Sequence, residues 1–222
     1  MEENADIVLP WWAAYQYRFA FVEAKSHYWP RLIEAYGEPD HFLVAGCDDE
    51  AQPPSSTAHW PQAIREVRLP QSGDGDEEMH MLQAETVWVS YLDLPFRMAS
   101  DSPYAVRDAW GNRVDFEFDE DETISWALKV DQLGYLADAP AKYAYLGAWL
   151  AHGGALDLSR FEGAAFAVID TDDGAVAFEG LVEFRMDDTA LSGEMVYQLN
   201  FSALTEPGEY YIRIPGVGRS WT

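Results

Sequence analysis

The chain has 222 residues, of which 48% are hydrophobic and 14% aromatic. This is enough apolar surface for one large globular domain or two ordinary ones, and it excludes a disordered chain or a disulfide-dependent mini-protein. Only 14 Lys and Arg stand against 39 Asp and Glu, which gives a formal net charge of −25 at pH 7. Because that charge repels phosphate backbones and anionic lipids, we expect neither nucleic acid nor a membrane as a partner.

The sequence gives few signs of where the protein works. The single cysteine, Cys47, excludes a disulfide within the chain. The opening segment MEENADIVLP has acidic residues where a secretory signal is basic, and no apolar run of about 18 residues is present. We therefore expect a soluble chain without a signal peptide. Adaptation to high salt and solubility alone would each explain the acidic excess.

Strand signals begin in the first half of the chain. The segment WPRLIEAY, residues 29–36, fits two helical turns or a short strand equally well. Further on, Val114, Phe116 and Phe118 alternate with charged residues, as in a strand that is buried on one face. The dipeptide Gly-Asn at 111–112 precedes this strand and predicts a tight hairpin turn.

Two segments of the second half show the same alternation. Val182, Phe184 and Met186 share one face of the first segment, and the alternate apolar residues from Tyr197 to Phe201 share one face of the second. Both patterns indicate antiparallel strands with one face in water.

Turn chemistry separates these strands at short intervals. Asp-Gly at 173–174 and Pro-Gly at 207–208 each stand between apolar runs. The spacing predicts an all-β chain of two tandem antiparallel β-sandwich domains, each of the size of an immunoglobulin-like sandwich.

A charge run marks the expected boundary between the domains. Residues 119–123, DEDET, contain no apolar side chain and follow the predicted hairpin directly. We place an N-terminal β-sandwich-like domain over residues 1–122 and a second sandwich over 123–222. The acids at 119–122 could supply oxygen ligands to a calcium ion between the sandwiches, and a solvated linker is the alternative.

The chain carries none of the common catalytic signatures, such as GxSxG, HExxH, CxxC or a Walker A loop. We therefore predict no catalytic residue and, apart from the calcium alternative, no metal or cofactor. Nine tryptophans are many for this length, and aromatic faces on loops commonly hold sugar rings. The candidate carbohydrate contacts are Trp60, Trp110 and Trp149, and covering a sandwich core is the alternative role of each.

Several motifs follow one another in the second half. The run DQLGY at 131–135 is followed by Pro140 and Lys142, then by VYQLNFS at 196–202 and PGEYY at 207–211. Together they resemble the N-terminal immunoglobulin-like domain of family 9 glycoside hydrolases, with its N-Q-x-G-Y and V-Y-x-x-D-F-S motifs. Asp131 and Asn200 stand where that family usually has Asn and Asp. The first half resembles, more loosely, a β-rich segment that precedes this domain in some larger members.

The resemblance implies that the second sandwich is immunoglobulin-like and that the protein is extracellular or periplasmic. In that family the catalytic Asp and Glu lie on an (α/α)₆ barrel that follows this domain. The chain ends at Thr222, where the barrel would begin, so we expect no catalytic domain here. The expected function is a non-catalytic scaffold of a family 9-type cellulase or related β-glucan hydrolase. The alternative is a stand-alone carbohydrate-binding module.

The same resemblance implies a partner and a surface to bind it. The expected partner is the downstream barrel, with β-glucan as a second candidate. We expect the barrel to dock on Gln132, Tyr135, Tyr210 and Trp221, because their segments hold few carboxylates and include the end of the chain.

Overall fold

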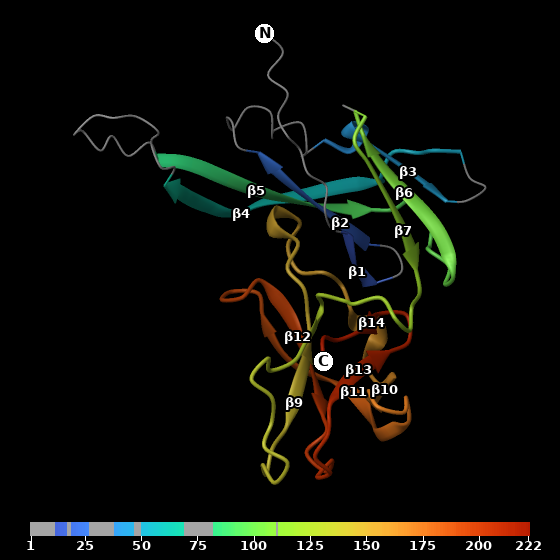
Figure 1. Cartoon of the computed structure of the whole chain (residues 1–222), viewed down its shortest axis with the longest axis vertical. Helices are drawn as coiled ribbons and strands as arrows, with labels where there is room; N and C mark the ends of the chain where they lie inside the picture. The colour runs from blue at the N-terminus through green and yellow to red at the C-terminus, as the bar shows by residue number, and fades with distance from the viewer. Residues whose placement is uncertain (1–11, 17–18, 27–37, 47–49, 69–81, 110) are drawn as a thin grey trace, which may run out of the picture.

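The computed structural model describes residues 12–16, 19–26, 38–46, 50–68, 82–109 and 111–222. Their regular structure consists of strands, which pair in antiparallel sheets, and of short 3₁₀ turns (Figure 1). This confirms the predicted all-β fold. The segment 29–36 lies outside the described residues, so its helix or strand stays a prediction. No helix within the described ranges is long and apolar enough to cross a membrane.

The first half of the chain forms two sheets. Its elements are β1 (Trp12–Gln16), β2 (Phe19–Ser26), η3 (Pro39–His41), β3 (Phe42–Gly46), β4 (Ser56–Arg68), β5 (Leu82–Asp93), β6 (Ser102–Asp108) and β7 (Arg113–Phe118). One sheet has the order β1-β2-β5-β4 and the other the order β3-β6-β7. The buried core over the second sheet consists of Phe42, Val44, Leu92, Leu94, Met98, Tyr104, Val106, Phe116 and Phe118.

The predicted hairpin of the first half is confirmed. Strands β6 and β7 pair on either side of Gly111, whose positive φ of 92° suits the turn. The buried carboxylate of Asp108 accepts hydrogen bonds from the backbone N–H (2.8 Å) and the side-chain amide (2.7 Å) of Asn112. Phe116 and Phe118 are buried, as their alternation predicts. Asp108 therefore stabilises the turn that sets this register.

The second half forms a seven-stranded sheet. Its elements are β8 (Leu128–Lys129), β9 (Tyr143–Leu146), η4 (Ala151–Gly153), η5 (Ser159–Phe161), β10 (Ala165–Asp170), β11 (Val176–Asp188), β12 (Glu194–Asn200), β13 (Tyr210–Ile214) and β14 (Gly218–Arg219). The strand order is β14-β13-β10-β11-β12-β9-β8. Strand β11 pairs with β10 up to Leu181 and with β12 from Val182 onwards. The two parts of the sheet therefore pack over one shared core, to which β8, β9, β10, β12 and β13 all contribute.

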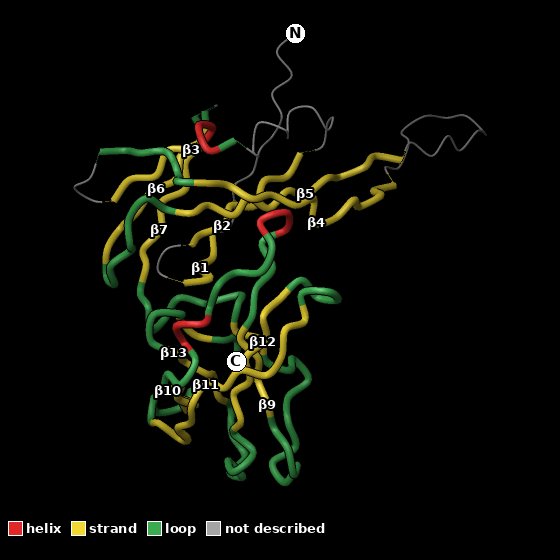
Figure 2. The backbone as a smooth tube through the Cα atoms, turned by 180° about the vertical axis from the view of Figure 1, so that it is seen from behind, coloured by secondary structure: helices red, strands yellow, loops and turns green. Residues whose placement is uncertain are grey.

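The two groups of sheets lie at opposite ends of the molecule, and Figure 2 shows the same division from behind. The turn η4 contacts β4 of the first half. Among the described strands, each sheet consists either of strands before residue 122 or of strands after it. The division into domains 1–122 and 123–222 stays a prediction.

The alternation of the second half holds in one strand and fails in part of the other. Tyr197, Leu199 and Phe201 are buried, as predicted. In β11, Val182 is buried but Phe184 and Met186 are 43% and 44% exposed, so the prediction is wrong for the end of this strand. The register shifts between Phe184 and Met186, which indicates a β-bulge. The β11–β12 hairpin thus extends past the core.

The junction between the halves is attached to the last strand of the chain. Ile124 forms a parallel bridge to Arg219, whose backbone N–H donates to the Thr123 carbonyl (2.9 Å) and whose carbonyl accepts from Ser125 N–H (2.8 Å). The Arg219 guanidinium also donates to the Glu122 carbonyl (2.9 Å) and lies over the ring of Tyr211. The junction is thus a short added strand on β14.

The acidic side chains of the junction bind a backbone amide and two arginines of the chain. The Asp119 carboxylate accepts from Asp121 N–H (2.8 Å), and the carboxylates of Asp121 and Glu122 pair with Arg213 (3.7 Å) and Arg219 (3.5 Å). Among the described residues, no group of three or more His, Cys, Asp or Glu side chains is placed to hold a metal ion. The calcium alternative stays a prediction.

Candidate functional site: a cavity beside the C-terminus

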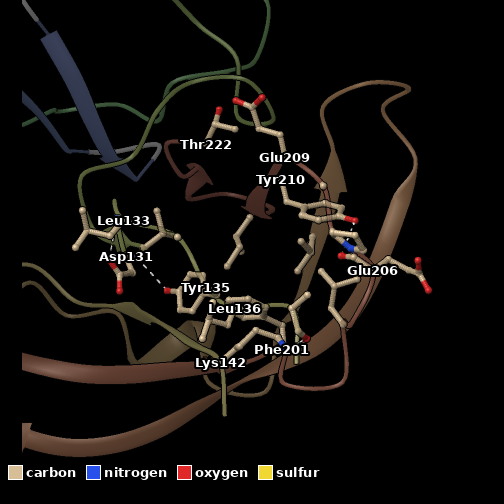
Figure 3. A pocket seen from close by; sticks show the side chains of 18 of the residues that line it. Asp131, Leu133, Tyr135, Leu136, Lys142, Phe201, Glu206, Glu209, Tyr210 and Thr222 are labelled. Carbon is tan, nitrogen blue, oxygen red and sulfur yellow. Dashed lines mark hydrogen bonds between the residues drawn. The ribbon is translucent and has the colours of Figure 1, made fainter. Parts of the chain in front are cut away.

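A cavity of about 490 Å³ opens where two loops of the second half meet (Figure 3). One wall is the segment 130–137, which follows β8, and the other is the segment 204–210, which leads into β13. Val168, Phe201 and Ile212 form the apolar floor. Thr222 lies at the mouth, so the end of the chain borders the cavity.

The first wall is a loop with a defined backbone. The Asp131 carboxylate accepts from Leu133 N–H (2.9 Å), and the Asp131 carbonyl accepts from Gly134 N–H (3.1 Å). Gly134 has a φ of +84°, which favours glycine at this turn. Further along, Ala139 N–H donates to the Leu136 carbonyl (3.0 Å). The two turns define the backbone path of this loop.

Tyr135 anchors this loop to the sheet. Its hydroxyl donates to the Tyr143 carbonyl of β9 (2.7 Å) and accepts from Asp131 N–H (3.0 Å). Its ring meets Phe201 edge-on, with the ring centroids 4.9 Å apart. Burial raises the pKa of Tyr135 above its usual value, which keeps the hydroxyl protonated. One side chain thus connects the loop, β9 and the core.

We expect Tyr135→Phe to lower the free energy of unfolding by about 1 kcal/mol, because the hydroxyl makes two hydrogen bonds to the backbone. Tyr210→Phe is the matched control. Its hydroxyl makes one longer bond, to the Glu206 carbonyl (3.2 Å), at an exposed site, and we expect a loss under about 0.5 kcal/mol. Urea unfolding of the three proteins measures both values. Equal losses would show that Tyr135 has no special anchoring role.

Lys142 holds the far end of the loop and is buried, with 3% of its surface exposed. Its ammonium donates to the carbonyls of Ala137 (2.9 Å) and Ala139 (3.3 Å). Its backbone N–H donates to the Ser202 hydroxyl (2.9 Å), which in turn donates to the Asn200 side-chain oxygen (2.7 Å). An aspartate at position 200 could accept the same bond, so this departure from the family motif preserves the contact.

The opposite wall depends on a glycine. A Cβ atom on Gly208 would lie 2.7 Å from the Tyr210 hydroxyl oxygen, so a larger residue would displace the Tyr210 ring. Tyr210 lines the cavity opposite Tyr135 (Figure 3). The glycine at 208, at which the backbone bends, therefore leaves room for this ring.

A second hollow of about 330 Å³ adjoins the first. Its walls include Trp126, Val130, Gln132 and Trp221. Gln132 and Val130 line both hollows, and Trp221 is 42% exposed. The structure thus brings the four predicted docking residues, Gln132, Tyr135, Tyr210 and Trp221, to one region of the surface.

Two leucines of this region were missed by the sequence analysis. Leu133 is 98% exposed and Leu136 is 75% exposed, and both lie on the cavity wall. Their sequence signal was present, since apolar residues flank Gly134 within a polar loop. Fully burying a leucine contributes about 1.5–3 kcal/mol, so exposed leucines on a fixed loop favour a binding surface.

The predicted carbohydrate contacts do not gather at this site. Trp149 is half-buried, and its indole packs so close to Gly193 that a Cβ there would lie 2.5 Å from it. This contact favours the alternative role, in which Trp149 covers the β11–β12 turn. Trp60 lies in β4, with its side chain outside what the structure describes, and Trp110 lies outside the described residues.

The chemistry of the cavity suits binding. Its tyrosine hydroxyls and the Lys142 ammonium are engaged in hydrogen bonds that hold the loops. Asp131, Glu206 and Glu209 stand around the apolar floor. The site therefore offers an apolar depression with carboxylates around it.

Comparisons with known proteins agree with the fold described for the second half of the chain. Residues 125–219 match the family model described as the cellulase N-terminal ig-like domain. A cellodextrinase from Butyrivibrio fibrisolvens is 38% identical over 88 residues, which are 39% of this chain and 13% of that protein. The chain thus spans only a small part of that relative.

Solved structures give weaker likenesses. A metagenome-derived glycoside hydrolase family 9 endoglucanase shares 30% identity over 42% of this chain and 16% of its own, with a TM-score of 0.35. A pullulanase from Anoxybacillus sp. LM18-11, solved with maltotriose, shares 10% identity over 93% of this chain and 24% of its own, with a TM-score of 0.27. The family match and the antiparallel sheet over one core agree on the second half: residues 125–219 are similar to the immunoglobulin-like domain found at the N-terminus of cellulases.

Proposed function

We propose that this chain is a non-catalytic accessory region of a family 9-type glycoside hydrolase, and that it supports a catalytic barrel which follows it. The match of residues 125–219 to an N-terminal domain of cellulases carries the proposal. The relative's length supports it too, because the match accounts for 13% of the cellodextrinase. In this proposal the protein acts outside the cell on a β-glucan.

The surface that would meet the barrel is the docking face, which we define as Gln132, Leu133, Tyr135, Leu136, Tyr210 and Trp221. It combines exposed leucines, which would lose water on binding, with aromatic rings, which are enriched at the centre of protein interfaces. Tyr135 and Lys142 hold its loop before any partner binds, so little ordering of the loop would be needed.

Docking within one chain would stabilise the folded barrel through binding. A partner that binds only the folded barrel raises the barrel's stability, and a covalent connection makes the effective concentration of that partner high. The docking face therefore needs only modest intrinsic affinity. We expect the joined protein to unfold at a higher temperature than the barrel alone.

Substitutions on one exposed leucine test this proposal. In the full-length protein, Leu136→Asp should lower the unfolding temperature of the barrel toward that of the barrel alone, because a carboxylate would be buried at the interface. The matched control is Leu191→Asp, at a leucine that is 89% exposed on the β11–β12 turn, and it should leave that temperature unchanged. Scanning calorimetry measures both.

The isolated chain provides the other controls. Both substitutions should leave its own unfolding unchanged, and it should release no reducing sugar from amorphous cellulose. Equal unfolding of the barrel with and without this chain would contradict the scaffold. If β-glucan also quenched the tryptophan fluorescence of the isolated chain, the carbohydrate-binding alternative would take its place.

A further inference from the structure

Strand β5 is buried on both of its faces. Ser90, Tyr91 and Leu92 follow one another along this strand, and all three are buried. Successive side chains of a strand point to opposite faces of its sheet, so both faces are covered here. Leu92 belongs to the core of the first half, whereas Tyr91 belongs to the buried core cluster of the second half. A side chain of the first half thus takes part in the core of the second.

The sheet that carries Tyr91 also contacts the second half at both of its edges. In its order β1-β2-β5-β4, strands β1 and β4 are the outer two. Strand β1 contacts β14, and β4 contacts the turn η4. Figures 1 and 2 show this sheet lying across one end of the second half, and Figure 2 draws η4 in red beside β4. The contacts therefore span the width of the sheet, with the strand of Tyr91 between them.

The turn η4 has a backbone conformation that needs support. Ala151 has a φ of +55°, which is disfavoured for alanine, and it is buried. Two hydrogen bonds close the loop: the Leu150 N–H donates to the Gly154 carbonyl (2.7 Å), and the Gly153 N–H donates to the Leu150 carbonyl (2.9 Å). Leu150 and Ala151 belong to the same buried cluster as Tyr91. Because strained backbone persists only where its surroundings hold it, the cover from the first half helps to keep η4 in place.

The connection between the halves is short and is bonded at both ends. The Glu120 N–H donates to the Ser100 hydroxyl of the first half (2.9 Å). The Thr123 N–H donates to the Asp119 carbonyl (2.8 Å), which closes the junction into a turn, and the chain then bridges to β14. Two domains move relative to each other by default unless their interface is large and apolar. This junction leaves little slack for such motion.

We propose that the two halves form one rigid body, in which the sheet β1-β2-β5-β4 is the fixed partner of η4 and Tyr91 is its anchor. The surface around η4 is then an interface with the chain's own first half. Every contact that carries the inference lies within this chain, so it goes beyond the scaffold proposal and does not depend on it. The first half keeps one orientation whatever the docking face binds.

Rotational tumbling of the unmodified chain tests the rigid body. Nitrogen-15 relaxation gives a rotational correlation time for the amides of each half separately. We expect the same time in both halves, and it should be that of a particle with the mass of the whole chain. Shorter times, as two tethered domains would give, would overturn the proposal whether or not a barrel is stabilised in a longer protein.

The substitution Tyr91→Ala tests the anchor. We expect it to shorten the correlation times and to speed hydrogen exchange at the amide of Gly153 by about tenfold or more, because the loop loses its cover. The matched control is Tyr104→Ala. Tyr104 is buried as well, but its ring stacks on Phe96 and Phe116 within the core of the first half. This control should leave the correlation times unchanged, and equal effects of the two substitutions would overturn the role of Tyr91.

One further amide shows whether the first half stays folded in each variant. The Asp108 N–H donates to the Asn112 carbonyl (3.0 Å) in the β6–β7 hairpin. Slow exchange at Asp108 together with fast exchange at Gly153 in Tyr91→Ala would support the loss of docking alone. Slow exchange at both amides in that variant would overturn the anchor. If Tyr91→Ala unfolded the hairpin too, the correlation times of the unmodified chain would still decide between one rigid body and two tethered domains.

Discussion

We expect Gly218→Ala to lower the free energy of unfolding by about 3 kcal/mol, which is one of the two largest effects that we predict. Gly218 has a φ of +109°, a backbone conformation that residues other than glycine rarely adopt. A Cβ atom there would also overlap the Thr123 carbonyl oxygen, which accepts the Arg219 N–H. Because that oxygen belongs to the backbone, relief of the overlap would separate the junction from β14.

A second glycine that has a positive φ but no overlap helps to separate the two causes. Gly163 has a φ of +79°, and a Cβ atom there would meet nothing within 4 Å. Gly163→Ala should cost roughly 1–2 kcal/mol, from the left-handed conformation alone. Urea unfolding followed by tryptophan fluorescence measures both variants. If Gly218→Ala cost no more than Gly163→Ala, the attachment of the junction to β14 would contribute little to stability.

Local chemistry made much of the fold predictable. The dipeptides at 111–112 and 173–174 each place a glycine with a positive φ between two paired strands, and the dipeptide at 207–208 precedes β13. Alternation identified the buried face over 197–201 because that strand lies in the middle of its ladder. It failed at the end of β11, where a bulge and the protruding hairpin remove the core from one face.

The candidate site was predictable in part, and through motifs alone. Gln132 and Tyr135 stand near Tyr210 and Trp221 because the chain returns to β13 and β14 beside the loop after β8, and no local pattern contains that return. The exposure of Leu136 depends on the conformation of the loop. Lys142 is buried because carbonyls of that same loop turn toward it. Hydrophobic periodicity reports local structure, so it does not predict contacts between segments that are distant in the sequence.

The second large effect is expected for Lys142→Met, which removes the ammonium while keeping a long apolar side chain. The carbonyls of the half-buried Ala137 and Ala139 would lose their donor, and each unsatisfied buried group costs about 1–3 kcal/mol. Because water can reach part of the loop, we expect a total loss of about 3 kcal/mol. Urea unfolding measures the loss.

Lys129→Met is the matched control for this substitution. Lys129 pairs with Glu194 at a site where 43% of the lysine side chain is exposed, and such pairs contribute about 0–1 kcal/mol. Hydrogen exchange distinguishes the two lysines further. Only Lys142→Met should speed exchange at the amides of Gly134 and Ala139, whose hydrogen bonds form the two turns of the loop. If exchange there stayed slow, Tyr135 alone would hold the loop, and the docking face would keep its shape without the buried ammonium.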